Sequence, residues 1–204
     1  PVNVLRERYE SALGDPNIVG LSIASRPDCI NEENADLLAE YAERLPLFTV
    51  ELGLQSAFQN RLSWVNRQET LDDYYKSMEI LGARKIPVIS HVILGFPGET
   101  AEEMRTTALL ADQLGSAGIK LQMLHVIKGT KMGVMHSRNP FSLMSMDEYG
   151  ELVVSIVERL SPTIEIHRIT GETEGSQLLA PEWVRHKTKF FDSVSYTHLR
   201  AHET

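Results

Sequence analysis

The chain alternates between short apolar runs and longer segments in which apolar residues recur at helical spacing. Runs of this length predict buried strands, and the helical stripes predict amphipathic helices that cover them. Units that repeat at roughly 30–40 residues are typical of βαβ connections and a parallel sheet. The pattern fits both a barrel-like and an open doubly wound sheet. The predicted strands are 18–24, 48–54, 87–94, 119–127 and a shorter one at 164–169.

Capping residues mark where the helices begin. Thr100 with Glu103, and Ser145 with Glu148, have the spacing of a capping box, in which side chain and backbone satisfy each other's free amides. Two further helices are predicted for 1–13 and, shorter, for 56–65. The four capped helices begin after Asn31, Thr70, Thr100 and Ser145.

Polar residues cluster at or just after the predicted strand ends. Barrel enzymes place their chemistry at the carboxyl ends of the strands, so this distribution favours a barrel. The residues are Ser25, Arg26, Glu51, Gln55, His91, Gly95, His125 and Lys128.

Composition narrows the classes of protein. The 204 residues suffice for one domain, and a net charge of -8 argues against broad binding to nucleic acid or anionic membranes. No apolar run approaches the roughly 18 residues of a membrane span, and the N-terminus has no signal-peptide pattern. We therefore expect a cytoplasmic protein. The chain starts without methionine, which predicts that it begins within a longer protein.

The single cysteine, Cys29, excludes an internal disulfide and any multi-cysteine metal site built from this chain alone. The Walker phosphate loop, the Rossmann glycine fingerprint, the zinc-protease motif and the nucleophile elbow are also missing. The common hydrolase and nucleotide-binding interpretations are thereby removed.

Two predicted strand ends carry unusual polar groups. Alternation puts Glu51, Gly53 and Gln55 on one strand face, where a ligand or a Glu51–Gln55 hydrogen-bond network must satisfy the polar atoms. Arg26 can bind a carboxylate, or it can pair with Asp28 in a surface turn.

The next two strand ends are similarly open to two interpretations. His91, Ile93 and Gly95 share a predicted face, and the turn after them has amides that can receive an anion or simply connect strand to helix. Beyond, Gln122 and Leu124 are predicted to face one way, and Met123 and His125 the other. Lys128 follows this strand and has two interpretations: it contacts a phosphate or carboxylate, or it is a solvated loop residue.

The order of these motifs resembles the radical S-adenosylmethionine (SAM) superfamily, in particular a bacterial branch with a barrel similar to that of the Elongator catalytic subunit. The motifs are Ser-Arg-Pro-Asp (25–28), Glu-Leu-Gly-Leu-Gln-Ser (51–56), His-Val-Ile-Leu-Gly-Phe-Pro-Gly-Glu-Thr (91–100) and Leu-His-Val-Ile-Lys-Gly-Thr (124–130). The resemblance implies an α/β fold, an incomplete (β/α) barrel with about strands 3–6, a C-terminal helix and a short strand.

The same resemblance implies an N-terminally truncated fragment. The first two strands, and with them the Cys-x-x-x-Cys-x-x-Cys loop of a 4Fe-4S cluster, are expected upstream, so no metal ligand is assigned here and the fragment alone is expected to be inactive. The expected organisation is 1–14, the end of a helix; 15–170, the partial barrel; 171–193, the family's C-terminal tail; and 194–204, a non-native, adapter-like tail.

By resemblance, the full-length parent cleaves SAM at the cluster to give a 5′-deoxyadenosyl radical. A reductant such as flavodoxin or ferredoxin is implied as a partner, and RNA as a substrate class through the Elongator likeness. No residue is assigned to hydrogen abstraction.

The resemblance also implies roles for cofactor-binding residues. Ser25 and Arg26 line the methionine or substrate side, and Glu51 and Gln55 lie near the SAM amino group and ribose. Ile93 packs on adenine between His91, where the family more usually has glycine, and Gly95. The backbone of Leu124 and His125 meets adenine.

Two other functions stay open from the residues alone. One is a cluster-free barrel lyase or isomerase with Glu51 and His91 as acid and base, for which Lys128 is the candidate Schiff-base lysine. The other is a non-enzymatic binding module that uses an open sheet edge.

Overall fold

A computed structural model describes residues 1–171, 173, 176–192 and 194. Its centre is a five-stranded sheet in the order β1-β2-β3-β4-β6, in which all neighbours are parallel. The predicted α/β class is confirmed, and the sheet is open, with β1 and β6 at its edges, as in an incomplete barrel. The strands are β1 (Gly20–Ser25), β2 (Leu47–Gln55), β3 (Val88–Leu94), β4 (Gly118–Met123) and β6 (Glu165–Arg168).

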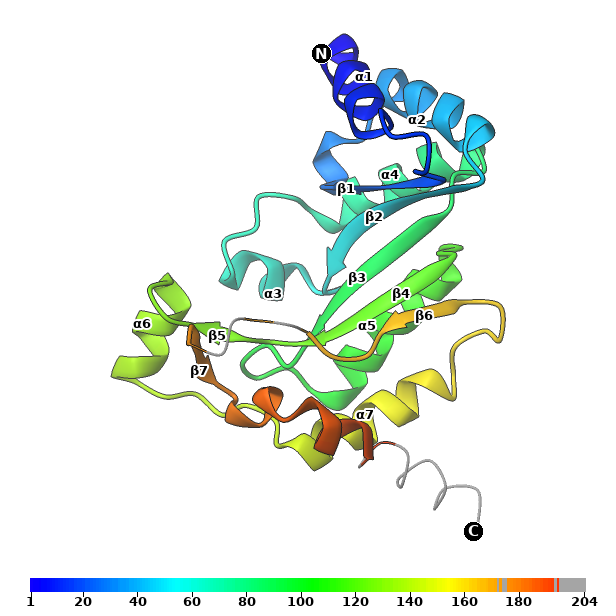
Figure 1. Cartoon of the computed structure of the whole chain (residues 1–204). Helices are drawn as coiled ribbons and strands as arrows, with labels where there is room; N and C mark the ends of the chain where they lie inside the picture. The colour runs from blue at the N-terminus through cyan, green and yellow to red at the C-terminus, as the bar shows by residue number, and fades with distance from the viewer. Residues whose placement is uncertain (172, 174–175, 193, 195–204) are drawn as a thin grey trace.

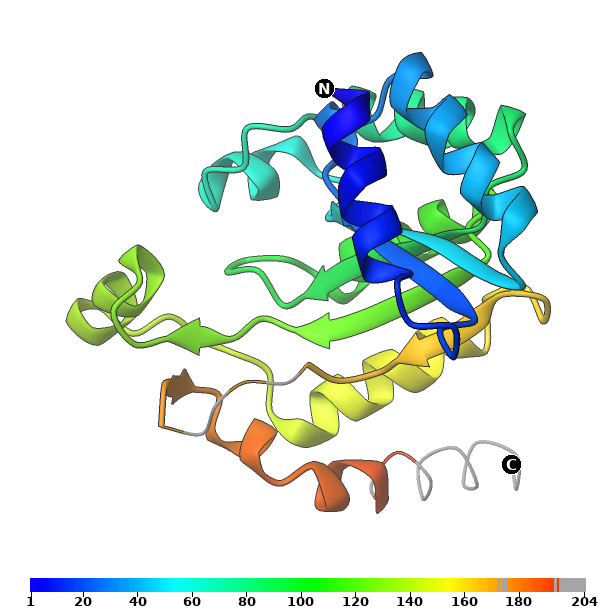
Figure 2. The same ribbon diagram turned by 45° about the horizontal axis from the view of Figure 1, so that its top comes forward.

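Four helices connect these strands and cover one face of the sheet (Figures 1 and 2). Because the strand order in space follows the order in sequence, each right-handed crossover returns its helix to the same face. The opposite face is therefore left without a helical layer. The covering helices are α2 (Glu32–Arg44), α4 (Leu71–Ala83), α5 (Ala101–Gln113) and α7 (Met146–Val157).

The core lies between the sheet and the helices. Val50, Leu52 and Leu54 point into it and are at most 2% exposed, whereas the alternate residues Glu51 and Gly53 are half-buried on the other face. A hydrogen-bonded chain also crosses the core: the Tyr74 hydroxyl contacts Ser90 Oγ at 2.5 Å. Ser90 Oγ in turn contacts Ser116 Oγ at 2.6 Å, which ties α4 to the sheet.

The predicted helix starts are confirmed. Capping boxes are present at Asn31, Thr70, Thr100 and Ser145, and the side chain of each accepts a hydrogen bond from the backbone three residues on. The short helix expected at 56–65 is α3 (Gln59–Trp64), and the first helix is α1 (Val2–Ala12). These short-range signals act within one turn of helix, so the sequence carries them completely.

The predicted strand 119–127 is wrong as a single element. β4 ends at Met123, and Val126–Ile127 forms β5, which pairs antiparallel with β7 (Leu178–Ala180) in a separate small sheet. Pairing decides the break, because β3 ends at Leu94 and offers no further partner. Between β5 and the α7 cap lies an unpredicted helix, α6 (Lys131–Arg138).

Both ends of the described chain pack on the helical layer. Tyr9 of α1 meets Tyr41 of α2 edge to face, with ring centroids 5.3 Å apart. Near the other end, a short η2 turn (Glu182–Arg185) carries Trp183, whose ring centroid lies 5.4 Å from that of Tyr149 in α7. The tail expected to be non-native, 194–204, lies outside the described residues except for Val194.

Gly133 tests how closely α6 docks on β5. A Cβ built at Gly133 would lie 2.2 Å from the backbone oxygen of Ile127, so Gly133→Ala forces helix and strand apart. We expect a loss of about 1–3 kcal/mol in the free energy of unfolding, measured by urea titration. Gly82→Ala in α4 is the control, because no atom lies within 4 Å of its Cβ; an equal loss there would contradict the close approach.

Candidate functional site

The uncovered face of the sheet has the Glu51 carboxylate at its centre. Its Oε2 contacts Lys120 Nζ of β4 at 2.6 Å and His91 Nε2 of β3 at 2.7 Å. Its Oε1 accepts a hydrogen bond from Ser22 Oγ of β1 at 3.0 Å. Four adjacent strands thus converge on one side chain, because alternation turns these positions away from the helices. Glu51 and His91, the two residues named above for the alternative acid–base function, are therefore in direct contact.

Strand register explains why these side chains meet. His91 is level with Gly53 on β2 and with Lys120 on β4. Gly53 has no side chain that would fill the space beside His91. The His91 ring and the Lys120 side chain can therefore reach Glu51, which lies two residues before Gly53 on the same face of β2. Ile93, half-buried, follows His91 on the same face of β3.

The carboxylate is held ionised. Burial acts to raise the pKa of Glu51, but hydrogen bonds from Lys120, His91 and Ser22 outweigh it and lower the pKa to about 2. Burial lowers the pKa of His91 despite its contact with Glu51, so the imidazole is neutral at pH 7. The cluster therefore contains a directly paired carboxylate and ammonium, and the neutral His91 ring contacts the same carboxylate oxygen.

Lys120 was not among the residues that the sequence singled out. Strand alternation places it on the same face as Gln122, and this signal was available. The sequence did not indicate that Glu51 is its partner, because the distance between Lys120 and Glu51 depends on the register of two strand pairs, β2–β3 and β3–β4.

Gln55 lies at the end of β2, but not in a network with Glu51. A register shift falls between Gly53 and Gln55, and Gln55 adopts a φ of 63°. Its amide folds back beneath Gly53, where an added Cβ would lie 2.6 Å from Gln55 Nε2. Gln55 Oε1 is buried and, among the described residues, has no hydrogen-bond partner. A buried acceptor without a partner is a candidate ligand contact.

Arg26 is engaged in the turn after β1. Its guanidinium binds Asp28 through Nε at 2.9 Å and Nη2 at 2.5 Å, and its Nε lies 3.5 Å from Glu69 Oε1. The turn-pair interpretation is therefore the one that the structure supports. The neighbouring Ser25 Oγ donates to the Arg26 carbonyl at 3.3 Å.

Gly95 does not share the face of His91 and Ile93, contrary to the prediction. It follows the end of β3 with a φ of 95°, and an added Cβ would approach Met144 Cε at 2.9 Å and Met123 Cε at 3.1 Å. The amides of Gly95 and Phe96 donate to Glu99 Oε2, each at 3.1 Å. The turn's own carboxylate thus occupies these two amides, which supports the plain strand-to-helix connection over the alternative of an anion site.

His125 and Leu124 lie in the break after β4. The Leu124 amide donates to the Leu94 carbonyl at 2.9 Å, which closes the strand pair. A Cβ at Gly171 would meet His125 Cε1 at 2.7 Å and Gln122 Cβ at 3.5 Å, so His125 and Gln122 lie on one side, not on opposite sides as predicted. Period-two alternation fails because the strand has ended. His125 Nε2 is buried without a partner in the described part of the chain.

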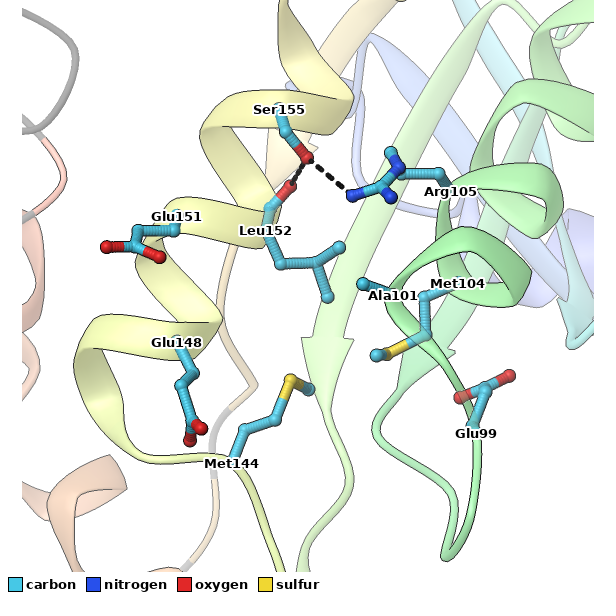
Figure 3. Close-up of a pocket in the computed structure, with 9 residues that line it drawn as sticks. All are labelled: Glu99, Ala101, Met104, Arg105, Met144, Glu148, Glu151, Leu152 and Ser155. Carbon is cyan, nitrogen blue, oxygen red and sulfur yellow. Dashed lines mark hydrogen bonds between the residues drawn. The ribbon is translucent and has the colours of Figure 1, made fainter. Parts of the chain in front are cut away.

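A hollow of about 500 Å³ lies elsewhere, between α5 and α7 (Figure 3). Met104 and Leu152 form its apolar floor, and Glu148 and Glu151 of α7 stand at its rim. Arg105 crosses it to Ser155 Oγ at 3.5 Å. The hollow belongs to the helical layer and is separate from the polar cluster on the open face.

The residues of this chain do not suit an iron–sulfur cluster. The only cysteine, Cys29, is exposed and lies in the η1 turn (Pro27–Cys29) beside Asp28. Within the described ranges, no three His, Cys, Asp or Glu side chains are grouped to hold a metal ion.

Comparison with protein families decides the identity. Residues 2–111, more than half of the chain, match the model described as the Radical SAM superfamily. The chain belongs to the radical SAM superfamily. Residues 116–197 match the Radical_SAM C-terminal domain as well. The family that the motif order predicted is confirmed.

This radical SAM chain is similar to parts of longer curated proteins. It is 36% identical over 195 residues to "Uncharacterized protein YtqA" of Bacillus subtilis, covering 96% of this chain and 60% of YtqA. It is 26% identical over 147 residues to the tRNA uridine(34) acetyltransferase of Methanocaldococcus infernus, covering 71% and 27%. The chain thus spans about 60% of the length of YtqA.

A solved structure supports the Elongator-like fold. The archaeal Elp3 of Methanocaldococcus infernus superposes with a TM-score of 0.70 at 22% identity, covering 85% of this chain and 42% of that one. Separately, none of the helices described here is long and apolar enough to cross a membrane.

A double-mutant cycle tests the Glu51–Lys120 pair. Lys120→Met leaves a partly buried carboxylate without its main counter-charge, so we expect a loss of about 2 kcal/mol in unfolding free energy at neutral pH. Adding Glu51→Gln should recover part of the loss, which urea unfolding of all four proteins would reveal. Lys76→Met on the exposed face of α4 is the control and should change stability by less than about 0.5 kcal/mol. Additive single effects would contradict the contact.

Acid unfolding tests the ionised state of Glu51. Its pKa is lowered from the ordinary 4.5 to about 2, so its contribution to stability is present above 4.5 and is lost as the pH falls toward 2. Glu51→Gln should remove that portion of the pH dependence. The stability difference between wild type and Glu51→Gln, measured by urea unfolding, should shrink across this range; a constant difference would show that Glu51 is not stabilised as a carboxylate.

Proposed function

We propose that this chain forms the SAM-binding part of a radical SAM enzyme, whose cluster-binding cysteines belong to a part of the parent protein outside this sequence. The observation that carries the proposal is the polar cluster around Glu51 on the one sheet face that no helix covers. Family membership and the coverage of YtqA support it. SAM bound beside a reduced cluster would supply a 5′-deoxyadenosyl radical for hydrogen abstraction.

Unsatisfied polar atoms on the described chain fit a bound cofactor. Among the described residues, Gln55 Oε1 and His125 Nε2 are buried without hydrogen-bond partners, and they lie at the carboxyl ends of β2 and β4, on either side of β3. An unpaired buried polar atom is costly, so a ligand that pairs with both would gain affinity. We propose that Gln55 and His125 contact polar groups of SAM, with Ile93 as the apolar surface for adenine.

In this proposal, one carboxylate oxygen of Glu51 accepts a hydrogen bond from the SAM amino group. Its Oε2 is already shared by Lys120 and His91, whereas Oε1 accepts only from Ser22 among the described residues. We therefore propose Oε1 as the acceptor for the ammonium. Lys120 and His91 then act as positioning residues that fix the carboxylate and keep it charged.

The pKa of Glu51 argues against a cluster-free lyase or isomerase. A general acid or base works best with a pKa near the operating pH. With a pKa of about 2, Glu51 is a poor acid and a weak base at neutral pH. Its contact with His91 is better explained as orientation of a permanent negative charge.

RNA is the substrate class that we propose for the parent enzyme. The proposal draws on the likeness to a tRNA uridine(34) acetyltransferase and to Elongator complex protein 3 of Dictyostelium discoideum, which is 24% identical over 176 residues. A flavodoxin or ferredoxin would supply the electron.

The decisive experiment uses the longer coding sequence. The parent protein, reconstituted anaerobically with iron and sulfide, should bind SAM and release 5′-deoxyadenosine after reduction. Glu51→Gln should raise the KM for SAM about tenfold or more, because it removes a charged hydrogen bond to the ammonium. Glu158→Gln, an exposed carboxylate at the end of α7, is the matched control.

Two results would overturn the proposal. One is a parent protein without three cysteines spaced for a cluster and without SAM cleavage. The other is an unchanged KM in Glu51→Gln together with full activity, which would remove Glu51 from the cofactor site.

A further inference from the structure

Residues 124–146, which we name the α6 arm, form a basic segment within an acidic protein. The chain has a net charge of -8, yet the arm contains no aspartate or glutamate. Lys128, Lys131 and Arg138 are exposed and, in the described part of the chain, form no ion pair. Their positive charge is therefore uncompensated.

Many other cations of the protein are used internally. Seven arginines and Lys120 are each bound to a carboxylate within the described residues. On the arm, by contrast, Lys131 and Arg138 are seven residues apart, which places them on one face of α6, about 10 Å apart along its axis. The arm thus presents a row of cations that have no carboxylate partner among the described residues.

Aromatic side chains join the arm to α3. Phe141 meets Trp64 edge to face at 5.9 Å and the His136 ring at 4.6 Å. Trp64 nevertheless keeps 39% of its surface exposed. α3 and α6 both lie beyond the carboxyl ends of the central strands, at the end of the sheet that carries Gln55 and His125 (Figures 1 and 2). The partly exposed Trp64 ring is therefore joined to the arm through Phe141 and lies at the same end of the sheet as the arm.

The arm is held in a defined position. β5 pairs with β7 at its base, and the Thr130 side chain caps α6 by accepting from the Gly133 amide at 3.0 Å. Gly133 lets the helix rest directly on the Ile127 carbonyl. These contacts fix the position of the cations and of Trp64 relative to the open face of the sheet.

We infer that the α6 arm and Trp64 bind a single-stranded segment of RNA. Cations in a row attract the phosphates, and an exposed aromatic ring beside them stacks on bases, which is how proteins hold single strands. The acidic remainder of the surface repels polyanions and directs them to this arm. The inference rests on the proposed function, since it locates the substrate of that same enzyme.

The test is RNA binding by the 204-residue chain, with fluorescein-labelled oligouridine as the probe and anisotropy as the readout. Three phosphate contacts predict a slope of about -2 for log affinity against log salt concentration. Replacing Lys128, Lys131 and Arg138 together by glutamine should lower affinity at least tenfold and bring the slope near zero. Trp64→Leu should lower affinity about tenfold, through lost stacking, with little change in slope.

A charge-matched control separates the arm from overall charge. Replacing Arg8, Lys76 and Lys85 by glutamine removes three exposed cations from the helical side of the protein, and RNA affinity should change less than twofold. Equal losses in both triple variants, or no RNA binding by the wild-type chain, would overturn the inference. So would displacement of oligouridine by polyglutamate as effective as by unlabelled RNA, since this would indicate a surface for acidic proteins.

SAM binding keeps this failure distinct from that of the enzyme proposal. In the parent protein the arm variants should bind SAM as tightly as the wild type, measured by equilibrium dialysis. Normal SAM cleavage, together with RNA affinity that is unchanged in the arm variants, would overturn only the inference about the arm. Weakened SAM affinity in the arm variants would also overturn it, because Lys128, Lys131 and Arg138 would then belong to the cofactor site.

Discussion

Every crossover in the central sheet returns its helix to the same side, and this chirality constraint shapes the rest of the molecule. Strands that follow one another in space as in sequence cannot be wound on both faces, so one face is sealed by α2, α4, α5 and α7. The other face is left to half-buried polar residues. Apolar side chains alternate toward the helices, and the chemistry collects where no helix can cover it.

On that open face, a single carboxylate organises its neighbours. Glu51 gathers Lys120, His91 and Ser22 from three other strands, and the ion pair compensates the cost of partial burial. A charge held in this way is suited to binding a cation and poorly suited to proton transfer, because its pKa lies far below neutral pH. The geometry therefore favours the cofactor role over acid–base chemistry.

The distribution of charge gives the acidic chain a local exception. Net charge alone argued against nucleic acid, yet this average hides an arm from which carboxylates are absent. Elsewhere seven arginines are bound to carboxylates, while in the described part of the chain the cations of the arm form no ion pair, and the arm contacts the partly exposed Trp64 through Phe141. Together with the cluster around Glu51, this distribution would place the proposed cofactor contacts and the proposed RNA contacts in the same molecule without overlap of the residues that carry them.

Sequence by itself determined the features that act over short range. The capping boxes at Thr100 and Ser145 and the alternation that turns Glu51 away from the core each depend on neighbours within a few residues, and the order of motifs was enough to identify the family. Tertiary structure alone decided the features that depend on pairing between distant strands. It ended β4 at Met123, turned Gly95 toward Met144 and brought Lys120 to Glu51. The physical reason is that register and strand length are set by partners far along the chain, which a local pattern does not record.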